Sequence, residues 1–189
     1  MGQREFVNKT FRLSRGQIEK LEIDAARSGK STNGLINSIV RKYIEWDRYA
    51  EAANFVSIMP NMVDAILEFV PNETIEKIAK HIGEKSCFKD VSLLIFQHYS
   101  LSEFYKMTSL LDRYGNNYRM QVRGNGTDDV SVSLYHNYGK RWSLFIGGIL
   151  HYELNRLKIE HSHEFSDNAI VFEFKSQGSP ILVDADKIS

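Results

Sequence analysis

The chain has 189 residues, of which 42% are hydrophobic and 25% charged, so it can bury a sizeable core as one or two domains. It carries one cysteine, Cys87, which excludes a disulfide within the chain and favours a reducing cytoplasm. Apolar stretches such as SLLIF and SLFIGGIL are far shorter than the roughly 18 to 20 residues that cross a bilayer. The start MGQREF lacks the apolar core of a signal peptide. We therefore expect a cytoplasmic protein that has no membrane partner.

The formal net charge is zero, but the charges are unevenly distributed. Residues 1–46 hold nine Lys and Arg against five Asp and Glu, whereas residues 47–189 hold fifteen against nineteen. A small basic module is thus followed by an acidic one. We expect a first domain over 1–46, a helical connection over 47–60, a second domain over 61–175 and a tail over 176–189.

A short strand is expected at residues 8–13, where polar and mostly apolar residues alternate. Period-two alternation places Phe11 and Leu13 on one face and Asn8, Thr10 and Arg12 on the other. The next strand-like run comes roughly a hundred residues later, and a lone strand leaves its backbone donors and acceptors unpaired. The strand therefore needs a partner from outside its own neighbourhood.

Two helices are expected directly after this strand. Ser14 with Gln17 forms a capping box for the first helix, which ends at Ser28 and Gly29, and Ser31 caps the second. This module of about 37 residues is too small to bury its apolar faces alone. A second copy would pair the strands antiparallel and give the four helices a common core. The apolar residues of the second helix recur at helical spacing: Leu35, Ile36, Ile39, Val40, Tyr43 and Ile44.

The stretch KTFRLSRGQIEKLEIDAARSGKSTNGLINSIVRKYI, within residues 8–45, resembles the ribbon-helix-helix repressors of the Arc and MetJ type. The resemblance rests on the strand alternation, the Leu-Ser entry to the first helix and the G-x-S turn before the second. It implies a dimer whose strand ribbon enters the DNA major groove. By matching position, the base-reading side chains would be Asn8, Thr10 and Arg12. Lys9 departs from the family pattern, because it takes an inward position usually filled by an apolar residue.

The residue types suit this role. Arg binds guanine bidentately, Asn does the same with adenine, and Thr offers a hydroxyl bond or a methyl contact to thymine. The amino terminus of the second helix would hold a DNA phosphate with free backbone N–H groups. The alternative is a dimerisation arm whose basic residues are solvated surface charges. The residues expected at the phosphate are Lys30, Ser31, Thr32 and Asn33.

The second domain is expected to be α+β. A helix continues from Ile44 toward Ser57, with Pro60 at its end, and four further helical patterns follow. The order then becomes two strands, a helix and two strands, which predicts a four-stranded antiparallel ββαββ sheet with helices against one face. The expected ranges are 118–123 and 130–136 for the first two strands, 140–155 for the helix, and 157–165 and 169–175 for the last two strands.

Three histidines are candidates for a metal site. Alternation places His161 and His163 on one strand face and puts His136 on the apolar side of its own strand. Three converging imidazoles would suit a transition metal, but no Cys or second close His pair supports one, so hydrogen-bonded core or edge histidines are the favoured interpretation. The sequence does not establish that the three converge, so no metal or cofactor is assigned.

Other chemistry-bearing residues favour structural roles. The stretch YHNYGKRWS could line a ligand pocket, but a turn Gly139 and a core Trp142 explain it. Cys87 has no nucleophile signature around it, and we expect no enzymatic activity. Four aromatic residues are expected to form core and pocket wall rather than a base-stacking surface: Phe104, Tyr105, Tyr114 and Tyr118.

These observations favour a homodimeric, or higher even-numbered, sequence-specific DNA-binding transcription regulator whose partner is double-stranded DNA. The second domain would sense a small-molecule or metal effector or extend the dimer interface. One alternative is an antitoxin or plasmid-partition protein with the same module. Another is a metal-binding or enzymatic second domain with an accessory DNA-binding module.

Overall fold

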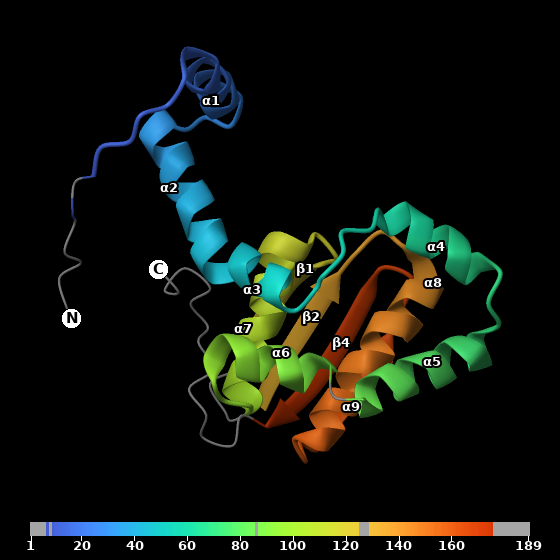
Figure 1. Ribbon diagram of the computed structural model, residues 1–189. Helices are drawn as coiled ribbons and strands as arrows, with labels where there is room; N and C mark the ends of the chain where they lie inside the picture. The colour runs from blue at the N-terminus through green and yellow to red at the C-terminus, as the bar shows by residue number, and fades with distance from the viewer. Residues whose placement is uncertain (1–6, 8, 86, 125–128, 176–189) are drawn as a thin grey trace. The chain divides into compact units, whose positions relative to one another are not determined.

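The computed structural model describes residues 7, 9–85, 87–124 and 129–175, without the side chain of Cys87 (Figure 1). The chain divides into two compact units, residues 1–47 and residues 48–189. The boundary thus falls inside the run of helix that follows Ile44.

The first unit contains two helices, α1 (Arg15–Arg27) and α2 (Thr32–Lys42), and a short π-helix, η1 (Tyr43–Asp47). The predicted capping box at Ser14 is confirmed: its hydroxyl oxygen accepts from the Gln17 backbone N–H at 3.3 Å, and the Gln17 side chain accepts from the Ser14 N–H at 2.9 Å. Gly29 has φ +65°, a conformation that suits glycine and ends α1. Ser31 caps α2 as predicted, accepting from the Gly34 N–H at 3.1 Å.

The segment before α1 is not assigned as a strand in this single chain. Residues 9–14 have no regular secondary structure, and Asn8 lies outside the described residues. A strand that pairs with a second copy has no partner in one chain, so the predicted ribbon stays a prediction.

The second unit starts with five helices, α3 (Arg48–Ala52), α4 (Pro60–Glu68), α5 (Asn72–Glu84), α6 (Cys87–Phe96) and α7 (Leu101–Leu110), the last continued by η2 (Leu111–Gly115). A further helical run comprises α8 (Gly139–Trp142), η3 (Ser143–Gly147) and α9 (Gly148–Arg156). The four helical patterns expected after Pro60 and the helix expected over 140–155 are thus confirmed. Within the described ranges, no helix has the length and apolar content needed to cross a membrane.

The predicted helix toward Ser57 is wrong in its second half. Helix α3 ends at Ala52, and Asn54 adopts a left-handed φ of 54°. Pro60 stands at the start of α4 rather than at the end of the preceding helix. Proline fits the first helical position because its missing N–H would have no partner there.

The sheet consists of β1 (Arg119–Gly124), β2 (Asp129–Tyr135), β3 (His161–Phe165) and β4 (Ala169–Lys175). All neighbours are antiparallel and the order is β1-β2-β4-β3, which confirms the predicted ββαββ arrangement. The third strand begins at His161 rather than Leu157, because Leu157 is the C-cap of α9 and Lys158 turns the chain with a φ of 58°. Strand β3 is therefore short and lies at the edge of the sheet.

Helices of the second unit cover one face of the sheet (Figure 1). Buried side chains of α7 and α9 form a common core with the strands. The segment η3 lies beside β3 and β4, and α5 packs against α9. Alternate residues of the strands point into this core and the others point to the opposite, more polar face. Large side chains that are fully buried at the helix–sheet interface include Phe104, Leu134, Leu154, Ile170 and Phe172.

Candidate functional site

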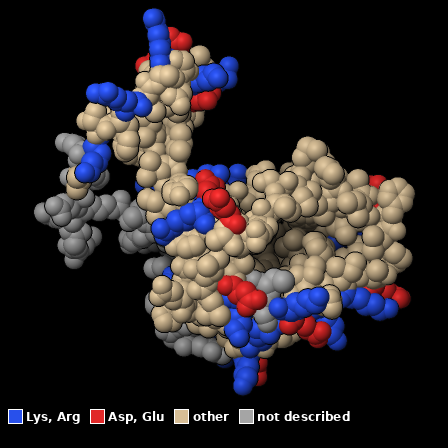
Figure 2. Space-filling view, in the orientation of Figure 1, with Lys and Arg blue, Asp and Glu red and all other residues tan. Residues whose placement is uncertain are grey.

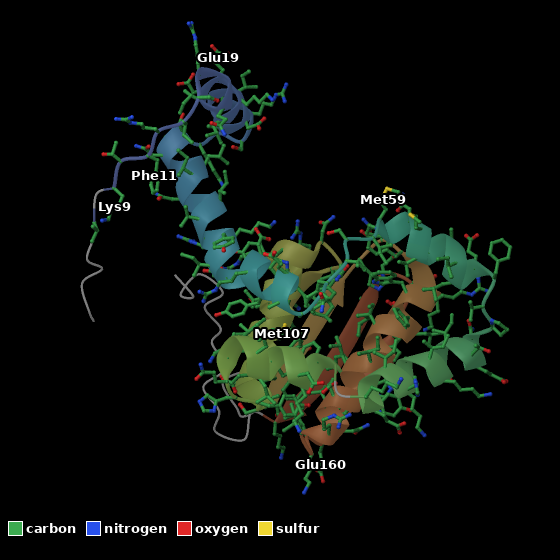
Figure 3. All side chains as sticks on the ribbon, viewed as in Figure 1. Lys9, Phe11, Glu19, Met59, Met107 and Glu160 are labelled. Atoms are coloured by element: carbon green, nitrogen blue, oxygen red, sulfur yellow. The ribbon has the colours of Figure 1, made fainter. Side chains whose placement is uncertain are left out.

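The expected base-reading residues lie before α1. Thr10 and Arg12 are exposed, and Asn8 lies outside the described residues. Phe11, labelled in Figure 3, is 75% exposed, although the alternation assigns it to a core. The structure thus leaves both faces of the segment open in the single chain.

Helix α2 and η1 also expose their apolar side. Among the described residues of the first unit, Ala25 is the one hydrophobic residue that is buried. Exposure of a row of large apolar side chains is unusual for a folded unit and is typical of an interaction surface. The exposed row consists of Ile39, Val40, Tyr43 and Ile44.

The residues expected at a phosphate lie together at the start of α2. The Ser31 side chain caps the helix, and Thr32 and Asn33 are its first two residues, whose backbone N–H groups have no acceptor within a helix. The Lys30 ammonium donates to the Ser38 hydroxyl at 3.2 Å, so it lies along the same helix. Figure 2 shows Lys and Arg side chains projecting from the first unit, with Asp and Glu side chains among them.

A cluster of three histidines lies in the second unit. His161 and His163 are on the inward face of β3, as predicted, opposite Phe174 and Phe172 of β4. The third member is His151 of α9, whose Nδ1 is 2.9 Å from His161 Nε2. One ring nitrogen from each of the three histidines can be chosen so that all lie within 4.8 Å of one another.

Neighbouring groups orient two of these rings. His161 Nδ1 lies 2.8 Å from the Ile159 carbonyl oxygen, so Nδ1 carries the proton and Nε2 is left as an acceptor. The other nitrogen of His151, Nε2, lies 3.0 Å from the Asn155 side-chain amide. The His163 ring stacks on Phe165 with a centroid distance of 4.8 Å.

Two members of the cluster, His151 and His163, favour the neutral imidazole. Partial burial, together with the neighbouring His163 and His161, lowers the pKa of His151 to about 4. Burial, and then the neighbouring His161, also lower the pKa of His163. Neutral imidazole is the form that binds a metal.

His136 is not part of this cluster, although it was one of the three histidines considered from the sequence. It is buried, its Nε2 lies 2.7 Å from the Ser143 hydroxyl, and its Nδ1 accepts from the Tyr138 N–H. Ser143 in turn donates to the Ser166 carbonyl at 2.5 Å. His136 is thus a hydrogen-bonded core histidine, and burial lowers its pKa.

Sequence reasoning missed His151 because its position depends on tertiary structure. A helix was expected there, but nothing in the helix alone indicates which strand it covers. The available signal was the short connection between α9 and β3, which brings the last turns of the helix close to the start of that strand. Figure 3 labels Glu160, which lies in this connection.

The expected core role is confirmed for three of the four aromatic residues. Phe104, Tyr105 and Tyr118 are buried in the main core, and Tyr114 is half-buried. Trp142 is buried in a second cluster with Leu67 and Ile75. The stretch from Asn137 to Arg141 lines a pocket together with Asp64, Glu68 and Asn72.

Comparison of the chain with protein-family models, curated proteins and solved structures finds no match. Any functional assignment therefore depends on the residues and contacts described above.

Proposed function

We propose that the chain is a sequence-specific DNA-binding regulator that acts as a homodimer in the cytoplasm. Residues 9–44 of two copies would form a ribbon-helix-helix module, with the two strands paired antiparallel. The ribbon would enter the major groove, where Thr10 and Arg12, together with Asn8, would contact base edges.

One observation carries this proposal. Two helices with well-formed N-caps follow an exposed segment of alternating side chains, yet this unit buries almost none of its apolar residues. A second copy about a two-fold axis would cover Phe11, Leu13 and the exposed row of α2 and η1 at the same time. The segment's backbone would then gain the hydrogen-bond partners that a lone strand lacks.

The start of α2 supports binding of the DNA backbone. Its first N–H groups and the positive end of the helix dipole favour an anion, and Lys30 adds a positive charge nearby. Such contacts fix the register of a protein on the duplex without reading its sequence. Ser31, Thr32 and Asn33 would therefore strengthen binding to all sequences alike.

The test is selection of bound duplexes from a random library with the full-length protein. A shared motif with two-fold symmetry is expected, because each half-site would face one copy of the ribbon. Affinity should fall steeply as salt is raised, as counterions are released from the contacted phosphates. Absence of any enriched motif would contradict sequence-specific recognition.

Ser31→Ala gives a second test with a different readout. Loss of an N-cap costs about 0.5 to 2 kcal/mol of protein stability. Because Ser31 would also help to hold a DNA phosphate, Ser31→Ala should weaken binding to specific and scrambled duplexes equally. Ser28→Ala is the matched control, because Ser28 is the C-cap of α1 and its hydroxyl donates to the Asp24 carbonyl instead of capping a helix N-terminus. If Ser31→Ala altered base preference instead, the phosphate role would be wrong.

The second unit would sense an effector or extend the dimer. An antitoxin or partition protein remains the alternative for the first unit, but those proteins usually add a short disordered segment to this module, whereas here a folded unit follows. A ligand of the second unit can change DNA affinity only through different affinities for two states of the dimer.

A further inference from the structure

The three histidines of α9 and β3 form a site whose chemistry the DNA-binding proposal does not use. They lie wholly within the second unit, so the inference drawn from them is independent of the first unit and its function. Each residue is held by a regular element, and both elements pack on the same core, α9 through Leu150 and Leu154 and β3 through Phe165.

We propose that His151, His161 and His163 bind one divalent transition-metal ion of the class that prefers imidazole ligands, with zinc as the first candidate. Imidazole nitrogen suits zinc, copper and nickel, whereas magnesium and calcium require oxygen ligands. Three protein ligands leave a fourth position, which a water molecule would fill.

The spacing of the ring nitrogens fits such a site. With zinc–nitrogen bonds of about 2.0 to 2.1 Å, two nitrogens of a tetrahedral site lie about 3.3 Å apart. The distance from His151 Nδ1 to His161 Nε2 is 2.9 Å. One ring nitrogen from each of the three histidines can be chosen so that all three lie within 4.8 Å of one another. Small rotations of the side chains, chiefly that of His163, would bring all three nitrogens to one ion.

The hydrogen bonds around the rings have the pattern of a metal site. A ligating histidine normally donates its other ring N–H to a carbonyl or carboxylate, which fixes the ring and its tautomer. His161 does this through Nδ1 to the Ile159 carbonyl, which leaves Nε2 for the metal. Asn155 is placed to accept in the same way from His151 Nε2 once its amide oxygen faces the ring.

The site is open on one side. The three rings line a pocket with Asn155, Ile159, Lys158 and Glu160. His161 and His151 are half-buried and His163 is exposed, so an ion can enter and the fourth position can be reached by solvent. The alternative is a purely structural aromatic cluster. In it His163 packs on Phe165, and the hydrogen bond between His151 and His161 only holds the two rings together.

Zinc titration of the full-length, chelator-treated protein distinguishes the two. Isothermal calorimetry should show one zinc ion per chain, and His163→Ala should weaken the affinity by about 100-fold or more, because one of three ligands is lost. His81→Ala is the matched control, since His81 is an exposed histidine of α5 outside the cluster, and it should leave the affinity unchanged. His163 is exposed, so its replacement should not unfold the chain, which melting without metal would verify.

A thiolate substitution gives a spectroscopic check. His163→Cys should restore zinc binding, and its cobalt(II) form should show a sulfur-to-cobalt charge-transfer band that the wild type lacks. Failure of the wild type to bind zinc at micromolar concentration, or equal affinities of wild type and His163→Ala, would overturn the proposal. Zinc binding that is lost in His81→Ala instead would place the ion elsewhere.

Discussion

Phe11 and Arg12 are neighbours in the chain, yet the proposed ribbon gives them opposite tasks. Phe11 should enter the shared core of the dimer, so Phe11→Ala should cost about 3 to 5 kcal/mol of stability and dissociate the first unit. Arg12→Ala should leave the melting temperature nearly unchanged but remove about 1 to 3 kcal/mol of discrimination at one base pair in each half-site. Thermal melting and binding to specific and scrambled duplexes measure both effects.

A slip of the strand by one residue would exchange these outcomes, because alternate side chains point to opposite faces. The pair of variants therefore tests the register as well as the function. An Arg12→Ala protein that unfolds, or that keeps full selectivity, would show that this segment does not read DNA in the proposed way.

His136 predicts a pH dependence of stability. Burial lowers its pKa in the folded protein below the ordinary value near 6.5. Below that value His136 becomes protonated in the unfolded chain but stays neutral in the folded chain. The contribution of His136 to the free energy of unfolding is therefore fully present above pH 6.5 and is lost as the pH falls toward the folded pKa. Urea denaturation between pH 8 and pH 5 should therefore show the stability gap between wild type and His136→Gln narrowing as the pH falls.

The control for this series is His81→Gln. His81 is exposed on α5, so its replacement removes a histidine by the same substitution outside the buried core. A gap between wild type and His136→Gln that stays constant with pH would show that His136 is protonated equally in both states.

Close packing of α5 on the run from η3 to α9 depends on small residues. A Cβ added at Gly148 would lie 2.8 Å from the Ala79 Cβ of α5, closer than side chains tolerate. Gly148→Ala should thus cost about 1 to 3 kcal/mol, although alanine improves helix propensity by up to about 1 kcal/mol. Combining it with Ala79→Gly removes the clashing methyl group.

The double variant should be more stable than the sum of the two single changes predicts, with a coupling of about 0.5 to 3 kcal/mol. Denaturant unfolding of the four proteins measures this coupling. Additive effects would mean that the helices shift apart without cost. Gly16→Ala is a useful reference, because nothing lies within 4 Å of the position where its Cβ would be.

Local signals in the sequence predicted the elements best. The N-caps at Ser14 and Ser31 and the glycine turn at Gly29 depend on a few adjacent residues, and all three are present. The sheet followed from strand alternation, since the hydrophobic faces of β2 and β4 must both meet the core. One local signal was misread: Pro60 was expected to end a helix, but proline also suits the first helical position, and it starts α4.

The candidate metal site could be predicted only in part, because its three ligands come from two elements that are brought together by tertiary packing. Alternation placed His161 and His163 on the inward face of a strand, and this is confirmed. Choosing the third ligand required the strand order, which puts β3 at the sheet edge, and the packing of α9 beside it. His136, two strands away from β3, could not be excluded by any pattern within its own strand.

The division of the chain into two units predicts that its two proposed activities are separable. All three histidines and the core that holds them lie in residues 48–189, whereas every proposed DNA contact lies in residues 1–47. A chain that starts at Arg48 should therefore bind zinc with the affinity of the full-length protein and show no specific DNA binding. Calorimetry and duplex binding, with circular dichroism to verify folding, measure the two properties on the same sample.

The full-length protein provides the complementary measurement. His163→Ala should keep specific DNA binding in metal-free buffer, because its site is confined to the second unit, while Arg12→Ala should keep its zinc affinity. Sedimentation of the full chain should show a dimer at micromolar concentration, and Phe11→Ala should lower its association if residues 9–44 supply the interface. If the wild-type protein were a monomer and still selected a two-fold symmetric DNA site, each copy would have to bind its half-site alone. That result would contradict the shared strand ribbon on which the DNA-binding proposal depends.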